Sequence, residues 1–212
     1  MLCYSNIQIT FREKTYVRDL SLTVGERDLV LLSGRSGCGK STLLNLALGF
    51  VRPAGGTVSF RGRPLDQKTV WQARTQIAYV NQDTQIGSGT VRTLIEQYFG
   101  FRNNRHRQLT PPQLNETCAL FSLDPAVVLD QAVSELSGGE RQRVALVIAW
   151  LLGRNIFFLD EPTAALDGDL KETVARAFAG RQDTTTVVIS HDEAWYRLPG
   201  VKVFDVEEER WM

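Results

Sequence analysis

The amino-acid sequence predicts an α/β fold with a mainly parallel sheet, an N-terminal antiparallel β part and an inserted helical lobe. Its 212 residues, of which 43% are hydrophobic and 23% charged, match an ordinary globular domain with a sizeable core. Strand-like stretches alternate with helix-like stretches, a pattern typical of parallel sheets. An apolar run at residues 29–32 leads directly into a glycine-rich segment and an apolar helix. We therefore expect one domain over residues 1–212.

The first third of the chain is expected to contain five strands and one helix. Residues 7–11 and 20–24 alternate apolar and polar side chains, which predicts strands with one buried face. Residues 29–32 are apolar throughout, as in a strand buried on both faces. A helical apolar pattern follows at 43–48, and further strands are predicted at 57–60 and 77–80.

The middle of the chain is predicted to form the helical lobe, at residues 90 to about 135, between core segments 1–89 and 136–212. Thr90 is a suitable N-cap for a helix from residue 91 to about residue 99. Thr110 precedes two prolines, and proline is favoured at the first position of a helix.

The last third returns to alternating strands and helices. Strands are predicted at 156–159, 187–189 and 201–206, and helices from Ser137 to about 152 and at 170–179. The acidic run at residues 207–209 is interpreted as a solvated end rather than a binding site.

Composition excludes several classes of protein. Lys plus Arg and Asp plus Glu both number 24, so the net charge is zero and strong attraction to nucleic acid is not expected. The longest apolar run, at residues 144–152, is far shorter than the roughly 20 residues that a membrane span needs. The N-terminus lacks a signal-peptide pattern and the three cysteines suit a reducing compartment, so we expect a cytoplasmic protein.

The glycine-rich segment fits the phosphate-binding P-loop pattern, Gly34-x-x-x-x-Gly39-Lys40-Ser41, between a strand and a helix as the pattern requires. Its glycines let backbone N–H groups approach phosphate oxygens at the positive end of the helix. Lys40 supplies a charge for the β- and γ-phosphates, and the Ser41 hydroxyl can coordinate Mg²⁺. The alternative is an ordinary glycine-rich turn. The predicted ATP-binding residues of this loop are Gly34, Arg35, Ser36, Gly37, Cys38, Gly39, Lys40, Ser41 and Thr42.

Two carboxylates follow the apolar strand that ends near residue 159. Open parallel sheets place ligands beyond the carboxyl ends of their strands. If this strand neighbours the P-loop strand, Asp160 comes close to Ser41 and can organise Mg²⁺. Glu161 can then act as a base or orient a water that attacks the γ-phosphate. The alternative is that both carboxylates cap the next helix.

A second glycine-containing helix start lies at Leu136-Ser137-Gly138-Gly139-Glu140. Ser137 and Glu140 satisfy a capping box, but capping alone does not call for two adjacent glycines. The glycines permit close approach of a large anion. This second site is interpreted as serving a nucleotide bound on another copy of the chain, which predicts a two-fold dimer with ATP between subunits.

Taken together, these motifs resemble the ATP-binding subunit of an ATP-binding-cassette (ABC) transporter, over residues 6 to 206. The motifs occur in the family order: residues 34–41, Gln82, residues 136–140, 160–163, 164–167 and His191. The resemblance implies an ABC-type ATPase fold built on a P-loop NTPase core. It also implies that two subunits close head to tail around two Mg-ATP and hydrolyse them. The family further implies a separate membrane-spanning permease, gripped by the helical lobe and the segment after Gln82, at the inner face of the cell membrane.

The resemblance also assigns roles residue by residue. It implies that Gln82 contacts Mg²⁺ and the attacking water, that Glu161 polarises this water and that His191 contacts the γ-phosphate. It implies that Asp167 links the protomers, and that Ser137, Gly138 and Gly139 close over the partner's ATP. Phe11 matches the aromatic residue that stacks on adenine, with Tyr16 as the next candidate and a core position as the alternative for Phe11.

Two alternative hypotheses and two departures from the family pattern stay open. A soluble ABC-type ATPase acting on nucleic acid or the ribosome is the second hypothesis, and a catalytically idle nucleotide-binding regulator is the third. Ile148 stands where the family often has arginine, and Ala164 where it often has serine. The appended regulatory domain of some importer subunits is expected to be absent.

Cys38 carries the last expectation from the sequence. It lies inside the P-loop beside Lys40 and a helix N-terminus, two features that can lower a thiol pKa. We therefore expect a reactive thiolate at Cys38 that ATP protects, with Cys3 and Cys118 as less reactive controls. The alternative is a small, inert turn residue.

Overall fold

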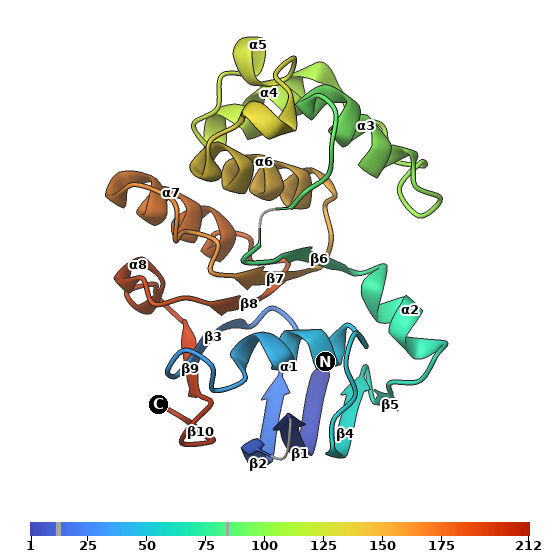
Figure 1. Ribbon diagram of the computed structural model, residues 1–212, viewed down its shortest axis with the longest axis vertical. Helices are drawn as coiled ribbons and strands as arrows, with labels where there is room; N and C mark the ends of the chain where they lie inside the picture. Colours follow the sequence, from blue (N-terminus) through green and yellow to red (C-terminus); the bar gives the residue numbers. More distant parts are fainter. Residues whose placement is uncertain (12–13, 84) are drawn as a thin grey trace.

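A six-stranded sheet forms the centre of the protein, in a computed structural model that describes residues 1–11, 14–83 and 85–212 (Figure 1). Its strand order is β10-β9-β3-β8-β7-β6, and all neighbouring pairs are parallel except β10 with β9. The bounds are β3 Leu29–Ser33, β6 Ile77–Val80, β7 Ile156–Asp160, β8 Thr185–Ile189, β9 Lys202–Asp205 and β10 Arg210–Trp211. The predicted mainly parallel sheet is confirmed.

A second, antiparallel sheet contains the N-terminus and has the order β2-β1-β4-β5. Its strands are β1 Leu2–Phe11, β2 Lys14–Val24, β4 Gly55–Phe60 and β5 Arg63–Pro64. The predicted antiparallel part is confirmed, but β1 and β2 are longer than expected. The buried positions of β1 change from Leu2 and Tyr4 to Ile7 and Ile9 across a register shift, which hides a single alternation from the sequence.

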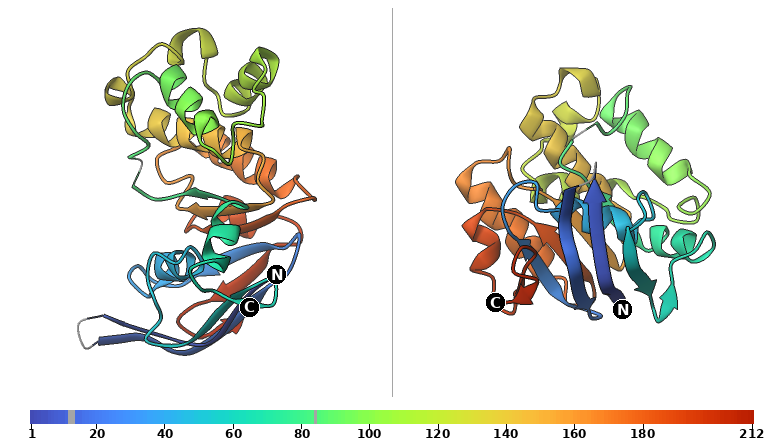
Figure 2. Two further views of the ribbon diagram at one scale, coloured as in Figure 1. Left: turned by 90° about the vertical axis from the view of Figure 1, so that its right-hand side faces the viewer. Right: turned by 60° about the horizontal axis from the view of Figure 1, so that its bottom comes forward.

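Helix α1 (Lys40–Ala47) lies between the two sheets, as Figure 2 shows from the side. Strand β3, which precedes α1 in the chain, is buried on both faces. Val30 and Leu32 of β3 pack with α1 and the antiparallel sheet, whereas Leu31 packs with the helices on the opposite face. This double burial holds the end of β3, and with it the start of the glycine-rich loop, in a fixed position.

A group of helices covers the other face of the six-stranded sheet and extends beyond it (Figure 1). They are α3 Val91–Gly100, α4 Pro111–Leu120, α5 Pro125–Val128, the 3₁₀ turn Val133–Glu135, α6 Gly138–Leu151 and α7 Gly168–Ala179. Thr90 accepts a hydrogen bond from Thr93 N, and Thr110 forms a capping box with Gln113, so the expected helix starts are confirmed. The division into a core and a helical lobe stays a prediction. Ile148 of α6 is buried in the apolar cluster that joins these helices to the sheet.

Two short helices were not predicted, α2 (Thr69–Arg74) and α8 (Glu193–Tyr196). Each is too short to show a helical apolar period, so tertiary packing decides its conformation. Among the described residues, no helix has the length and apolar character needed to cross a membrane.

Candidate nucleotide-binding site

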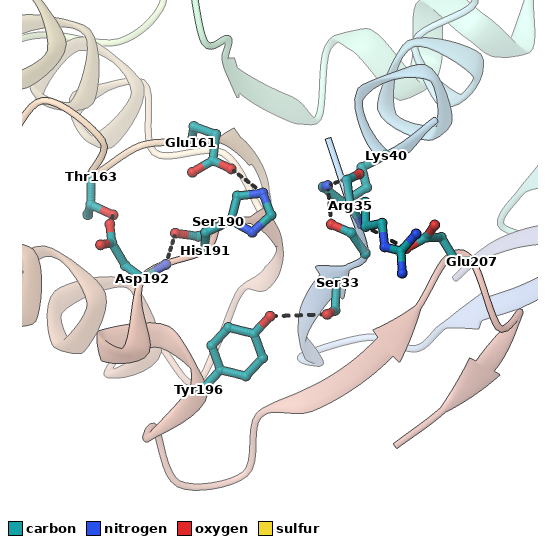
Figure 3. Close-up of polar contacts among 11 residues, drawn as sticks. Ser33, Arg35, Lys40, Glu161, Thr163, Ser190, His191, Asp192, Tyr196 and Glu207 are labelled. Carbon is teal, nitrogen blue, oxygen red and sulfur yellow. Dashed lines mark hydrogen bonds and ion pairs between the residues drawn. The ribbon is translucent and has the colours of Figure 1, made fainter. Parts of the chain in front are cut away.

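The glycine-rich loop connects β3 to α1 through backbone conformations that favour glycine. Gly34 has φ 129° and Gly39, at the N-cap of α1, has φ 108°. Lys40 folds back over this loop, where its Nζ donates hydrogen bonds to the carbonyl oxygens of Gly34 (2.6 Å) and Arg35 (2.9 Å) (Figure 3). Its ammonium group is therefore held at the centre of the loop, where an anion bound by the α1 N-terminus would meet it.

Asp160 reaches this loop from the end of β7, although β7 is not the neighbour of β3 in the sheet. We expected β7 to neighbour β3, but β8 lies between them. The three parallel strands end at one edge of the sheet, so Asp160 still lies close enough to Ser41 for this hydroxyl to influence its pKa.

The Asp160 carboxyl is suited to a cation. It is 3% exposed, and within the described part of the chain its Oδ1 has no hydrogen-bond partner. Burial raises its pKa, while the Ser41 hydroxyl and the Lys40 charge oppose this shift. A buried carboxylate oxygen with an unused lone pair beside a hydroxyl is the donor set that Mg²⁺ prefers, so the residues fit this metal.

Glu161 is held in a strained backbone conformation beside His191. Its φ is 50°, unusual for a residue other than glycine, and its N–H donates to the Ile189 carbonyl of β8 at 2.9 Å. Its Oε1 lies 3.5 Å from His191 Nε2 (Figure 3). Burial raises the pKa of Glu161, and the neighbouring His191 opposes this shift. The strain and the contact aim the carboxylate into the space in front of the glycine-rich loop.

A cleft of about 600 Å³ brings most of the predicted residues together. Its walls come from the glycine-rich loop and α1, from the loop after β6, and from the ends of β7 and β8. The predicted residues that line it are Ser36, Gly37, Gly39, Lys40, Ser41, Thr42, Gln82, Asp160, Glu161 and His191. Lys171 and Asp192, which sequence reasoning missed, line the same cleft.

Other predicted residues lie away from this cleft's described lining. Ser137 and Glu140 form the capping box of α6, with Ser137 N donating to Glu140 Oε2 at 2.8 Å. Asp167 caps α7 by accepting a hydrogen bond from Leu170 N at 3.0 Å. Gly138 faces open space, whereas a Cβ on Gly139 would lie 2.9 Å from the carbonyl oxygen of Ala165. Within one chain Ser137 and Asp167 cap helices, and the roles of these residues in binding a nucleotide stay predictions.

The predicted adenine contact cannot be placed for Phe11, whose side chain lies outside the described residues. The backbone of Phe11 ends β1 and pairs with Lys14. Tyr16, the second candidate, lies on β2 and is 40% exposed.

The sequence predicted a lowered pKa for Cys38, and this direction is wrong. Burial raises the pKa of Cys38, and the Glu207 carboxylate adds to this effect, which together outweigh the opposing charge of Lys40. Cys3, predicted to be a control, has a lowered pKa because the Ser5 and Thr23 hydroxyls hydrogen-bond to its sulfur. Burial also raises the pKa of Cys118.

Glu207 and Glu208 of the acidic run are exposed, as expected of a solvated end, but two carboxylates of the run also contact other segments. Glu207 Oε2 accepts a hydrogen bond from the backbone N–H of Arg35 at 2.9 Å, and Glu209 Oε1 accepts one from Arg18 N at 3.2 Å (Figure 3 shows Glu207). The turn before β10 thus touches both the glycine-rich loop and the antiparallel sheet. These contacts could not be predicted from local pattern, because they join residues more than 170 positions apart.

Comparison with known proteins agrees with this arrangement. Residues 17–164 match the family described as ABC transporter. The chain is 34% identical over 188 residues to an Fe(3+) ions import ATP-binding protein, FbpC 3, of Rhodococcus jostii, covering 87% of this chain and 53% of the relative. It is 32% identical over 185 residues to a multidrug resistance ABC transporter ATP-binding and permease protein of Lactococcus lactis subsp. cremoris, covering 82% of this chain and 30% of that protein. The chain therefore spans about half or less of the length of these relatives.

The fold is shared with solved structures. A dimeric bacterial ABC transporter cassette superposes with a TM-score of 0.82 at 24% identity, covering 98% of this chain and 95% of that one. This likeness extends over both sheets and the helices beyond them, so the expected ABC-type ATPase fold is confirmed.

Proposed function

This chain belongs to the ABC transporter family, and from that membership we propose that it binds ATP and hydrolyses it to energise transport through a separate membrane-spanning subunit. One observation carries the proposal: a P-loop, two carboxylates, a glutamine and a histidine from separate segments line one cleft. No single segment of the sequence supplies more than part of this set. A folded protein that brings them together has the groups that nucleotide hydrolysis requires.

ATP binding is assigned to the start of α1. The N–H groups of the loop and of the first helical turn would donate hydrogen bonds to phosphate oxygens, and Lys40 would neutralise the β- and γ-phosphates. Gly34 and Gly39 allow the loop to adopt positive φ, and Cys38 fills the space beside Gly34, whose Cβ position lies 2.9 Å from the Cys38 sulfur. The loop is therefore tightly shaped before any ligand binds.

Hydrolysis is assigned to Glu161 with His191 beside it. The Glu161 carboxylate would orient a water and accept its proton, and its raised pKa favours proton acceptance. His191, 3.5 Å from Glu161, would hold this carboxylate in place and donate to the terminal phosphate. When bound, Mg²⁺ supplies positive charge to the phosphates, and Ser41, Gln82 and Asp160 are the residues that would hold it.

A second copy of the chain is assigned to complete the site. Ser137, Gly138 and Gly139 belong to α6 and do not line the cleft within their own chain. Gly138 faces open space, so a phosphate of a partner's nucleotide could approach its backbone. A head-to-tail dimer would bring this surface over the cleft of the other subunit, with Asp167 near the join.

The membrane partner is assigned to the helical lobe and to the segment after Gln82. A smaller cavity there is lined by Tyr79, Gln85, Ile86, Tyr98 and Ile148. Gln82, which lines the nucleotide cleft, lies between Tyr79 and Gln85 in the sequence. Movement at Gln82 would thus reach this surface directly. The permease would carry the transport path, and would place the subunit at the inner face of the cell membrane.

Phosphate release from MgATP by the purified chain tests the proposal. We expect steady release that depends on Mg²⁺ and is lost in Lys40→Ala, which should also bind a fluorescent ATP analogue more weakly. Arg18→Ala is the matched control, since it removes a cation of the antiparallel sheet outside the cleft lining. Equal binding and turnover in Lys40→Ala and wild type would refute the assignment.

A further inference from the structure

A polar cluster lies directly behind His191 and joins three elements. Thr163 follows β7, Lys171 lies on α7, and Asp192 and Trp195 lie at the start of α8. Lys171 Nζ donates to Asp192 Oδ1 at 2.7 Å, and the Thr163 hydroxyl donates to Asp192 Oδ2. Trp195 Nε1 donates to the Thr163 oxygen at 3.3 Å. Both Asp192 oxygens are therefore used by groups from outside its own segment (Figure 3 shows Thr163 and Asp192).

The cluster is shielded from water, unlike the neighbouring ion pair on the same helix. Thr163 and Trp195 are fully buried, and the side chains of Lys171 and Asp192 are 26% and 21% exposed. By contrast, Arg176 and Glu172, one turn along α7, form a pair that is 74% and 51% exposed. Partial burial strengthens the Lys171–Asp192 attraction and makes the loss of one partner costly, whereas the exposed pair is screened.

His191 lines the cleft with an exposed side chain, so its position depends on how its backbone segment is held. Its side chain is 59% exposed, and its Nε2 lies 3.5 Å from Glu161 Oε1. The backbone on either side is anchored instead: Asp192 N donates to Ser190 Oγ at 3.1 Å, and the Ile189 carbonyl accepts from Glu161 N. Fixing Asp192 therefore fixes the residue that precedes it.

We propose that Lys171 is a positioning residue, whose ion pair with Asp192 holds the His191 segment so that the imidazole faces Glu161 and the terminal phosphate of ATP. The inference rests on the proposed function and extends it to a residue on α7. Lys171 lines the cleft together with Lys40, yet its nitrogen is directed to Asp192. It acts through His191 rather than on the nucleotide.

A purely architectural tie between α7 and α8 makes a different prediction. Removing such a tie would lower the melting temperature and weaken the binding of ATP and ADP alike. Removing a positioning residue affects the step that needs the γ-phosphate contact, because His191 would touch the phosphate that ADP lacks. The two roles can therefore be distinguished by measuring kcat and the affinity for ADP in the same variant, because a positioning role lowers kcat alone.

The test compares Lys171→Met, which keeps an unbranched side chain of similar length without its charge, with Lys171→Arg, which keeps the charge. Glu172→Gln is the matched control on the exposed pair. We expect Lys171→Met to lower kcat about tenfold, as misplacement of a reacting group does, with KM for ATP and Kd for ADP within about twofold of wild type. Lys171→Arg and Glu172→Gln should retain most of kcat. Wild-type kcat in Lys171→Met, or a loss of kcat matched by the loss of ADP affinity, would overturn the proposal.

A second measurement does not require hydrolysis. The chain contains two histidines, His106 and His191, so their ring signals in a proton–carbon NMR spectrum can be assigned with His191→Ala. Lys171→Met should move the His191 signal and leave the His106 signal in place. A chain that releases no phosphate would refute the proposed function, whereas an unmoved His191 signal would refute the role of Lys171.

Discussion

Two helices of this protein begin with glycine-containing segments, and their N-termini are completed in opposite ways. At α1, the N-cap is Gly39, which has no side chain to cap the helix, and Lys40 is drawn over the loop. At α6, Ser137 and Glu140 form a reciprocal capping box, so a carboxylate of the chain already occupies the positive end of the helix. The α1 end is thus the one built to receive an anion from outside.

The difference extends to the surroundings of each helix. Carboxylates, a glutamine and a histidine from other segments converge on the α1 end, whereas at the α6 end a Cβ on Gly139 would lie 2.9 Å from the Ala165 carbonyl oxygen. The α6 end is capped within its own chain, and Gly138 beside the cap faces open space. This difference agrees with the proposed head-to-tail dimer, in which the α1 end binds the nucleotide and the α6 end covers the cleft of a second copy.

The largest expected effect comes from Glu161 on the α1 side. Glu161→Gln keeps the size of the side chain but removes its charge and basicity, so kcat should fall about 10² to 10⁴-fold with ATP binding retained. The ATP-bound dimer should then persist in gel filtration with MgATP. In the wild type, burial raises the pKa of Glu161, so kcat should decline on acidification at a pH above the usual range of a glutamate. A variant with wild-type turnover would remove Glu161 from this role.

On the α6 side, Gly138→Asp should separate folding from activity. A Cβ at Gly138 meets no atom within 4 Å, and an acidic residue suits the first turn of a helix, so the melting temperature should not fall. The added charge would face the partner's phosphates, and hydrolysis should fall by at least about tenfold, the effect of roughly 1.4 kcal/mol. Gly139→Ala is the contrasting variant and should lower the melting temperature, because its Cβ would press on Ala165. Full activity in Gly138→Asp would contradict the dimer assignment.

A smaller effect is expected from the capping box itself. Ser137→Ala removes the acceptor for Glu140 N and should lower the free energy of unfolding by about 1 kcal/mol, measured by urea denaturation. Gly39, which caps α1 without a side chain, gives no comparable group to remove. No change in stability would show that the α6 cap is not needed for the fold.

The smallest expected effect concerns which of the three thiols reacts first with a maleimide. Cys3 has a lowered pKa and the pKa values of Cys38 and Cys118 are raised, so a maleimide should label Cys3 first near neutral pH. Glu207→Gln should speed labelling of Cys38, because the Glu207 charge contributes to its raised pKa. Glu208→Gln is the control, and mass spectrometry of the peptides gives the order. Labelling of Cys38 before Cys3 would restore the original expectation of a reactive thiolate in the loop.

The sequence predicted local features well and long-range contacts poorly. Thr90, Thr110 and Ser137 cap the expected helices, because capping acts within three residues. The central order of β3, β8 and β7 was not recovered, since strand neighbours are chosen by packing rather than by local pattern. The same holds for the candidate site: Lys40, Asp160 and Glu161 could be named from motifs, but Glu207 and Lys171 could not, because their partners lie far away in the chain.

The claim that each cleft is completed by a second copy is tested most directly by mixing two variants. Lys40→Ala disables the α1 end, and Gly138→Asp disables the α6 end, so each protein alone should release little phosphate from ATP. In a mixed head-to-tail dimer, the intact α1 end of one chain meets the intact α6 end of the other. Mixing should therefore restore phosphate release well above either variant alone. Activity that stays at the sum of the two separate proteins would contradict a site shared between chains.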